Sequence, residues 1–186
     1  MNYSIILKIL GWVVQLEGIF FVPPAITGFL YGETKDALVY LLLSAFCFGI
    51  GSLLRLKKVP KTAFYAKEGF VAVALSWILM SAIGALPFVL TGDIPYYPNA
   101  LFEIISGLTT TGSSILTDVE ALSHANLLWR SFSHWIGGMG ILVFMLAIVN
   151  LGGGQSNHLL RAESPGPSVS KMVPNMRKSS AILYGI

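Results

Sequence analysis

Three long apolar runs without Lys, Arg, Asp or Glu are the feature that most constrains the fold of this chain. They extend over Ala37–Leu54, Phe70–Leu90 and Ser131–Leu151. At about 1.5 Å per residue, each run is long enough to cross a hydrocarbon core of about 30 Å as a helix. Only 11% of the residues are charged, against about 25% in soluble domains. The sequence therefore predicts an all-α polytopic membrane protein.

A fourth, weaker apolar run covers Ile5–Tyr31 and is interrupted by Lys8, Glu17, Pro23 and Pro24. At about 100° per residue, Lys8 and Glu17 lie on opposite faces of a helix, so we do not expect them to pair. An ionisable residue within a span is a functional candidate by default. A position near the inner interface would instead make Glu17 harmless, and both interpretations stay open.

The basic residues indicate how the chain is oriented in the membrane. They gather in one loop and in the carboxyl tail, at Arg55, Lys57, Lys58, Lys61, Lys67, Arg161, Lys171, Arg177 and Lys178. Loops rich in Lys and Arg stay on the cytoplasmic side. We therefore expect a multi-pass protein of the cell (inner) membrane with both termini cytoplasmic. Because the positive charge follows the topology, the lipid bilayer is the expected partner and nucleic acid is not.

The segment Thr91–Arg130, between the third and fourth spans, contains a short apolar helix. We place this helix at Asn99–Leu108, with Asn99 as its N-cap. Extended backbone follows over Thr109–Ser114, and Ile115–Leu127 returns outward. A helix of about ten residues is too short to cross the bilayer, so the sequence predicts a re-entrant segment.

The run Thr109–Ser114 combines small hydroxyl residues with one glycine. Non-helical backbone occurs at membrane depth only where it is buried in protein or lines a water-filled cavity. Carbonyl oxygens at such a place can replace the hydration shell of a cation, and Gly112 allows dihedral angles that a side chain would obstruct. The sequence therefore predicts a potassium-type selectivity filter. An ordinary Ser/Thr turn outside the membrane is the alternative.

Charged and small residues around this run are candidates for its support. Glu103 and Arg130 either form an ion pair that braces the filter or are two independently solvated charges, because a buried pair must overcome a large desolvation cost. Gly137, Gly138 and Gly140 would let neighbouring backbones approach closely, although ordinary helix packing predicts the same residues.

An intramembrane serine hydrolase is a remote alternative. Its nucleophile would be Ser113, Ser114 or Ser131, with His134 or His124 as the base. The chain offers no glycine-x-serine elbow at these serines and no evident oxyanion hole, so we do not expect an enzyme. His134 shares a helix face with Arg130 and fits a structural hydrogen bond better than a pH sensor. The histidines lack metal-ligand spacing with carboxylates, so we expect no cofactor.

Several motifs share a further likeness. They are Phe102-Glu103 with Ser106-Gly107, Thr109-Thr110-Thr111-Gly112, Asp118-Val119-Glu120-Ala121-Leu122, Trp129-Arg130-Ser131, Trp135-Ile136-Gly137-Gly138-Met139-Gly140, and Leu160-Arg161-Ala162-Glu163 with Pro165-Gly166-Pro167. Together they resemble the first pore segment, the helix after it and the next cytoplasmic loop of the Trk/Ktr potassium transporter family. The likeness is closest to the amino-terminal portion of the Trk-type membrane subunit.

The resemblance implies a leading transmembrane helix pair over residues 1–60 and one helix–pore-loop–helix repeat over 61–151, with the filter segment at 109–114. A cytoplasmic loop and the start of a truncated next span would occupy 152–186. The implied activity is potassium uptake, with K+ as the substrate. The carbonyl groups of Thr110 and Thr111 would bind K+, Gly112 would be the filter glycine and Ser113 would stand at the outer mouth. Thr109, Glu103 and Arg130 would support the filter.

The implied partners follow from the number of filter segments. Transporters of this family need four, and this chain has one, so the remaining pore repeats or further copies of the chain must complete the ring. The tail ends at what resembles the opening of another span, over Ser180–Ile186, which favours a fragment of a longer transporter. A homodimer and a cytoplasmic nucleotide-binding regulatory subunit are implied as well. A truncated, non-transporting interaction module is the alternative function, and channel against H+- or Na+-coupled symport stays open.

Overall fold

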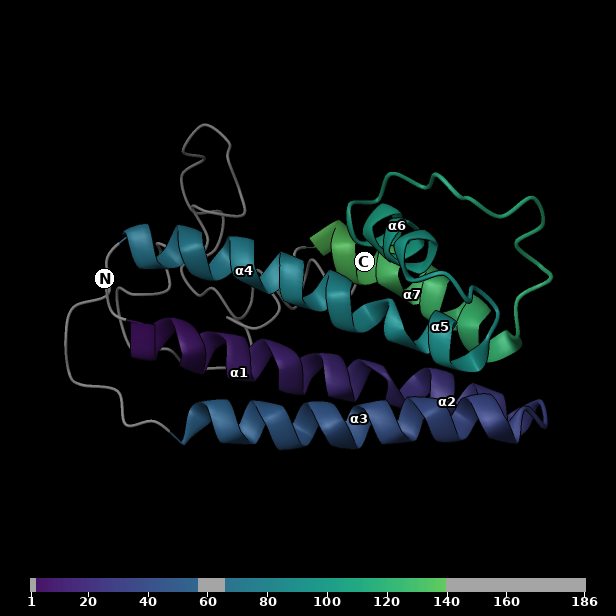
Figure 1. Ribbon diagram of the computed structural model, residues 1–186, viewed down its shortest axis with the longest axis horizontal. Coiled ribbons are helices and arrows are strands. Elements are labelled where there is room, and N and C mark those ends of the chain that lie inside the picture. Colours follow the sequence, from purple (N-terminus) through teal and green to yellow (C-terminus); the bar gives the residue numbers. More distant parts are fainter. Residues whose placement is uncertain (1–2, 57–65, 140–186) are drawn as a thin grey trace, which may run out of the picture.

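The computed structural model describes residues 3–56 and 66–139, and no strand occurs in these parts. Their helices, in chain order, are α1 (Tyr3–Phe20), α2 (Val22–Leu30), α3 (Thr34–Arg55), α4 (Ala66–Gly84), α5 (Leu86–Thr91), α6 (Tyr97–Leu108) and α7 (His124–Met139). Figure 1 shows α1 between α3 and α4, while α6 and α7 lie against the half of the bundle that holds α2 and α5. The all-α prediction is confirmed for the described residues.

Within residues 3–56 and 66–139, three helical segments are long and apolar enough to cross a membrane: Tyr3–Leu30, Thr34–Arg55 and Glu68–Thr91. They correspond to the first three predicted spans. The fourth predicted span, Ser131–Leu151, is described only as far as Met139.

The remaining predictions for the carboxyl end fall outside the described residues. They concern Gly140, the cytoplasmic loop and the truncated span over 152–186. The division of the chain at residues 60 and 61 stays a prediction as well. Contacts of α1 with α4, of α2 with α7 and of α3 with α5 join the leading helices to the rest of the bundle.

The leading helices cross at very close range. A Cβ atom built on Gly51 would lie 2.4 Å from Gln15 Cγ and 2.6 Å from the carbonyl oxygen of Gly11. Further along the same pair, the Ser44 hydroxyl donates to the Gly18 carbonyl oxygen at 2.7 Å. Lipid tails are as apolar as Leu, so close packing of small residues and hydrogen bonds between helices hold such pairs together.

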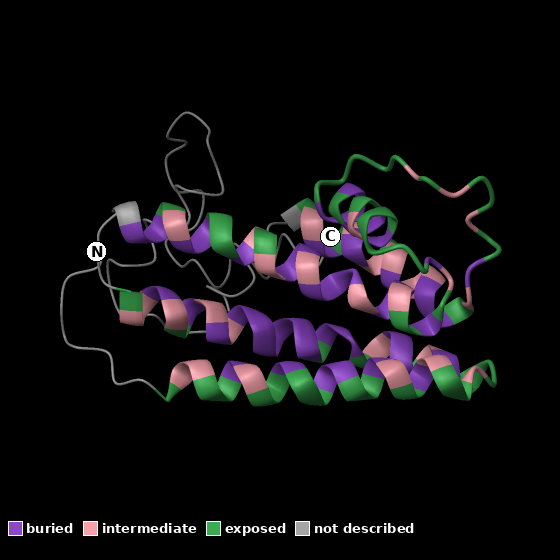
Figure 2. Cartoon of the chain, viewed as in Figure 1, coloured by how far each residue is buried: buried purple, intermediate pink, exposed green. Residues whose placement is uncertain are grey.

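The position of α1 within the bundle explains the burial of its residues. Figure 2 shows α1 buried on most sides, whereas α3 exposes the face turned away from α1. Lys8 is exposed and Glu17 has 0% of its surface exposed, so the two do not pair, as predicted. Neither carboxyl oxygen of Glu17 has a hydrogen-bond partner among the described residues. Glu17 is therefore not a solvated interfacial charge, and a functional role for it stays a prediction.

Two of the spans are broken near prolines. The first break lies at Phe21, just before Pro23 and Pro24, where the sequence predicts an interruption. The backbone N–H of Phe21 still donates to the Glu17 carbonyl oxygen at 3.1 Å. Because Pro is tolerated in the first turn of a helix, α2 can begin immediately.

The second break separates α4 from α5, beside Pro87. Carbonyl groups next to it accept hydrogen bonds from side chains elsewhere in the fold. Tyr97 Oη donates to the Ala82 oxygen at 3.1 Å, and Trp129 Nε1 donates to the Gly84 oxygen at 2.9 Å. Backbone polar groups in a bilayer must be satisfied within the protein, so these two side chains make the interruption tolerable.

A buried polar cluster ties α3, α5 and α7 together at the end of the bundle that carries the α2–α3 turn, on the right of Figure 1. Tyr40 Oη donates to Asn126 Oδ1 at 2.6 Å. The Asn126 amide nitrogen donates to Thr91 Oγ1 at 2.8 Å and to Asp93 Oδ2 at 2.7 Å. Since Asn126 is fully buried, these bonds satisfy groups that would otherwise be costly to bury.

Two predicted helix starts are wrong. The helix α7 begins at His124, seven residues before Ser131, so the last residues of the predicted return segment Ile115–Leu127 are helical. Ser123 caps α7, because its hydroxyl oxygen accepts the Asn126 N–H at 3.4 Å. This side chain is the local signal that sequence reasoning missed.

The other wrong start concerns Asn99, which is not the N-cap of α6. The helix begins at Tyr97, and Tyr96 occupies the N-cap position without a capping side-chain bond. Pro98 lies in the first turn, where its missing N–H has no helical partner to lose. The predicted end of the helix at Leu108 is confirmed.

The Gly11–Gly51 contact generates a stability prediction. Because an added Cβ collides with backbone, Gly51→Ala should lower the free energy of unfolding by about 1–3 kcal/mol. Gly49→Ala is the matched control on the same helix, since a Cβ there would meet nothing within 4 Å. The measurement is denaturant unfolding of the purified protein in detergent. Equal stabilities of the two variants would contradict the close crossing.

Candidate functional site

The end of α6 forms a helix cap that turns the chain sharply. The Thr111 N–H donates to the Ser106 oxygen and the Thr110 N–H donates to the Gly107 oxygen, both at 2.9 Å. Thr110 has a φ of +56°. This combination of bonds and a left-handed residue is a Schellman motif. It explains why α6 ends at Leu108.

Thr110 occupies a position at which such motifs usually carry glycine. The left-handed conformation costs a side-chain-bearing residue about 1–2 kcal/mol. The Thr110 hydroxyl donates to the Thr109 carbonyl oxygen at 2.7 Å, and the hydroxyl oxygens of Thr109 and Thr111 lie 2.8 Å apart. Strained backbone at a non-glycine residue is typical of functional sites. The sequence alone gave no signal for this strain.

The first four N–H groups of this segment, those of Thr109 to Gly112, all donate to carbonyl oxygens of α6. Besides the two bonds of the cap, the Thr109 N–H donates to the Ile105 oxygen at 2.8 Å and the Gly112 N–H to the Ser106 oxygen at 3.4 Å. No cis peptide bond is present in the described residues. In a trans peptide, the C=O of one residue and the N–H of the next point in opposite directions. The carbonyl groups of Thr109, Thr110 and Thr111 therefore point away from α6.

The carbonyl oxygens of this segment have few hydrogen-bond donors within the described part of the protein. Within residues 3–56 and 66–139, no hydrogen bond uses the carbonyl oxygens of Thr110, Thr111, Gly112 or Ser113. All four residues are exposed. Gly112 has a φ of +77°, and a Cβ there would meet nothing within 4 Å. Glycine is therefore favoured at this position by its backbone conformation and not by lack of space.

Behind the segment, one buried carboxylate holds three groups. Glu103 on α6 accepts the Ser114 hydroxyl at 2.9 and 3.0 Å and the Ile115 N–H at 3.1 Å. Arg130 Nε of α7 donates to Oε1 of Glu103 at 2.5 Å. The side chains of Glu103 and Arg130 are 0% and 15% exposed. They form a buried ion pair, so the alternative of two solvated charges is wrong.

The helix α7 also supports the segment through its glycines. A Cβ on Gly137 would lie 2.1 Å from the Leu108 carbonyl oxygen, so the two backbones touch. A Cβ on Gly138 would lie 3.9 Å from Thr110 Cγ2. Gly137 therefore lies against the last residue of α6 and Gly138 within van der Waals distance of Thr110, which both a filter support and ordinary helix packing predict.

The serine and histidine candidates for a hydrolase are not brought together. Ser114 donates to Glu103, and Ser131 is exposed on α7. His134 Nδ1 lies 2.9 Å from the Arg130 carbonyl oxygen, which is the structural hydrogen bond that the spacing favours. His124 contacts Glu33. In the described part of the chain, no serine hydroxyl bonds to a histidine ring.

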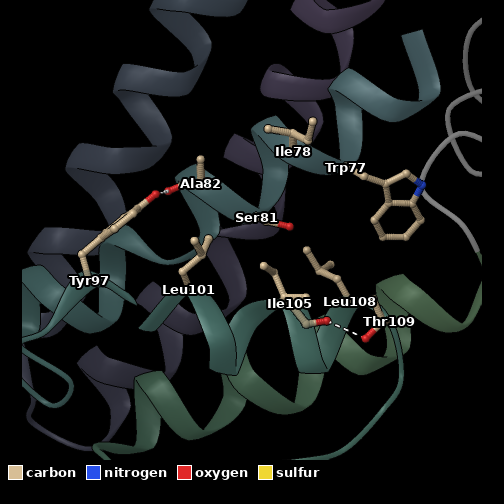
Figure 3. Close-up of a pocket in the computed structure, with 9 residues that line it drawn as sticks. All are labelled: Trp77, Ile78, Ser81, Ala82, Tyr97, Leu101, Ile105, Leu108 and Thr109. Atoms are coloured by element: carbon tan, nitrogen blue, oxygen red, sulfur yellow. Dashed lines mark hydrogen bonds between the residues drawn. The ribbon is translucent and has the colours of Figure 1, made fainter. Parts of the chain in front are cut away.

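An apolar groove that the sequence did not predict leads to this segment. Figure 3 shows it between α4 and α6, lined by Trp77, Ile78, Ser81, Ala82, Tyr97, Leu101, Ile105, Leu108 and Thr109. The volume of the groove is about 330 Å³. A second hollow of about 400 Å³ shares Trp77, Leu108 and Thr109 and reaches Gly137. The open face of α4 and α6 is thus continuous with the start of the filter segment.

The buried ion pair generates a second prediction. Arg130→Gln leaves the Glu103 carboxylate buried without a cation and should lower the free energy of unfolding by about 3–5 kcal/mol. In a double-mutant cycle with Glu103→Gln, the double variant should lose less than the sum of the single losses. Glu120→Gln, at an exposed carboxylate, should change stability by less than about 0.5 kcal/mol. A loss for Arg130→Gln no larger than that of Glu120→Gln would refute the pairing.

Comparisons with known proteins agree with the resemblance noted in the sequence. The family model described as "TrkH: Cation transport protein" matches residues 38–183. The Trk system potassium uptake protein TrkH of Halomonas elongata is 34% identical over 100% of this chain, and TrkG of Escherichia coli is 32% identical over 98%. An uncharacterized cation transporter of Methanocaldococcus jannaschii is 39% identical over 77%. The chain spans 39%, 38% and 30% of the lengths of these three relatives. It belongs to the TrkH family of cation transport proteins.

Proposed function

We propose that this chain supplies one cation-selecting segment of a potassium uptake transporter. The carbonyl oxygens of Thr110 and Thr111 bind dehydrated K+, Gly112 provides the filter turn and Ser113 lies at the outer mouth. One observation carries the proposal: the N–H groups of Thr109 to Gly112 are bonded to α6, and the carbonyl groups of Thr110 and Thr111 accept no hydrogen bond from the described residues. Such carbonyl groups can replace the hydration shell of a cation.

The surrounding charges favour a weakly held cation. The carboxyl end of α6, which is the negative end of its dipole, adjoins the segment. The formal charge of Glu103 is compensated by Arg130 at 2.5 Å, so the attraction for K+ comes from carbonyl dipoles. Conduction requires binding that is favourable enough for entry and weak enough for release. Glu103 then acts through Ser114 and Ile115, whose positions it holds, and Thr109 supports the segment through its bonds to α6.

The choice of potassium draws on the relatives. Two of those compared above are named Trk system potassium uptake proteins. The relatives and the family are named for transport and not for catalysis, which agrees with the expectation that the chain is not an enzyme. K+ is the substrate in this proposal, and the family together with three membrane-capable helices indicates a membrane protein.

The proposal requires partners for the segment. The chain spans about 39% of the length of the Halomonas relative, and the α4–α6 groove that reaches Thr109 is open. We place the remaining pore repeats on this groove. By the family resemblance, the complete protein is a homodimer regulated by a cytoplasmic nucleotide-binding subunit. The basic residues place both termini on the cytoplasmic side of the inner membrane. A non-transporting interaction module remains the competing function.

A pair of glycine variants tests the filter. Gly112→Ser puts a side chain on a backbone with positive φ among the proposed K+ ligands. The K+ to Na+ uptake ratio should fall by about tenfold, which is about 1.4 kcal/mol of lost discrimination. Gly49→Ser is the control, because a Cβ there would meet nothing within 4 Å and Gly49 lies on α3, away from the segment and from the groups that hold the start of α7. It receives the same side chain, so its ratio should not change.

The measurement uses the complete reading frame that carries this sequence, expressed in a bacterium deficient in potassium uptake. Uptake of both ions is normalised to the amount of transporter in the membrane. Growth on low potassium that depends on Gly112 supports the transporter. An unchanged ratio in Gly112→Ser would remove this glycine from the filter, and absence of any potassium uptake by the intact protein would favour the interaction module.

A further inference from the structure

We propose that the α2–α3 turn positions the filter segment, with Glu33 fixing the start of α7 and α7 passing this position to Glu103 through Arg130. This inference rests on the function proposed above and assigns a role in it to the leading helices, which contribute no residue to the segment. Glu33 is a positioning residue here, since it touches neither the segment nor the ion.

The contact between Glu33 and α7 joins residues far apart in the sequence. Glu33 Oε1 accepts the His124 backbone N–H and lies 2.8 Å from His124 Nδ1, and Oε2 accepts the Ala125 N–H at 3.1 Å. The first N–H groups of a helix have no partner within it, and a carboxylate there also interacts favourably with the helix dipole. The Tyr31 ring stacks on His124 with centroids 3.9 Å apart. The turn therefore holds the first residues of α7 through both Glu33 and Tyr31.

The charge state of Glu33 suits this contact. Partial desolvation opposes ionisation, but the hydrogen bonds from His124 and Ala125 outweigh it and lower the pKa of the Glu33 carboxyl. Glu33 is therefore an anion at neutral pH, which is the form that accepts all these bonds.

A second anchor lies in the same first turn of the helix and restricts its rotation. Asn126 is held by Tyr40 of α3 and by Asp93. Asp93 Oδ2 also accepts the Ser123 N–H at 2.9 Å. Because the two anchors approach α7 from different elements, its start is fixed in both position and orientation.

The position is passed on along a short piece of rigid helix. Arg130 lies six residues after His124, which is about 9 Å along an α-helix. Its bond to Glu103 is 2.5 Å long, and Glu103 holds Ser114 and Ile115. A displaced α7 start must therefore shift this ion pair or lengthen one of these bonds. The contacts form an unbroken series from Glu33 to the end of the filter segment.

The competing explanation is that Glu33 only stabilises the fold. Loss of stability lowers the amount of transporter in the membrane but leaves the K+ to Na+ uptake ratio of each folded molecule unchanged. A displaced filter changes the ratio itself. The ratio therefore separates positioning from stability.

The test measures this ratio for Glu33→Gln in the complete reading frame, beside Gly112→Ser and Glu120→Gln. We expect a fall of roughly two- to tenfold in Glu33→Gln and no change at the exposed Glu120. An unchanged ratio in Glu33→Gln, with the ratio altered in Gly112→Ser, overturns the positioning role alone. Unchanged ratios in both variants overturn the proposed function itself.

Two further variants complete the design. Combining Glu33→Gln with Arg130→Gln should give the same ratio as Arg130→Gln alone, because both act through one pair. If the double variant instead lowers the K+ to Na+ uptake ratio by the product of the two single effects, Glu33 acts by another route and the proposal is overturned. If Glu33→Gln does not accumulate, Glu33→Asp replaces it, since this variant keeps the charge but withdraws the carboxylate from the His124 and Ala125 N–H groups. A ratio unchanged in Glu33→Asp then counts against the proposal, and a lowered one supports it.

Discussion

The bond between Arg130 and Glu103 is the interaction on which the rest of this structure depends. A carboxylate with none of its side chain exposed would be strongly unfavourable without a cation, because burial removes its hydration. The same carboxylate binds Ser114 and Ile115. The Glu103 carboxylate therefore both compensates the charge of Arg130 and positions the loop at Ser114 and Ile115. Through it, α6, α7 and the extended segment share a common point.

Features that depend on local sequence and on the lipid environment could be predicted. The spans over Ala37–Leu54 and Phe70–Leu90 follow from hydropathy and length, and both occur as helices. The break before Pro23 follows from the chemistry of proline. The end of α6 at Leu108 agrees as well, since a run of hydroxyl residues with a glycine interrupts an apolar helix. These features need no knowledge of distant residues.

Features that depend on distant residues could not be predicted. The start of α7 at His124 is stabilised by Glu33, which lies in another turn of the chain, and the buried Asn126 is satisfied by Tyr40, Thr91 and Asp93, which are all distant in the sequence. The sequence suggested that Glu103 and Arg130 pair, but only the structure shows that the Glu103 side chain is buried. The left-handed Thr110 contradicts the preference of its residue type, so it follows from the packing around α6 and not from propensity.

The touching backbones at Gly137 and Leu108 have a genetic consequence. Every amino-acid replacement that one nucleotide change can make in a glycine codon introduces at least a Cβ atom. Such an atom would lie 2.1 Å from the Leu108 oxygen, which no native contact tolerates. Apart from synonymous changes, the codon for Gly137 therefore has no neutral neighbours, and any lineage that keeps this helix crossing must keep glycine at this position.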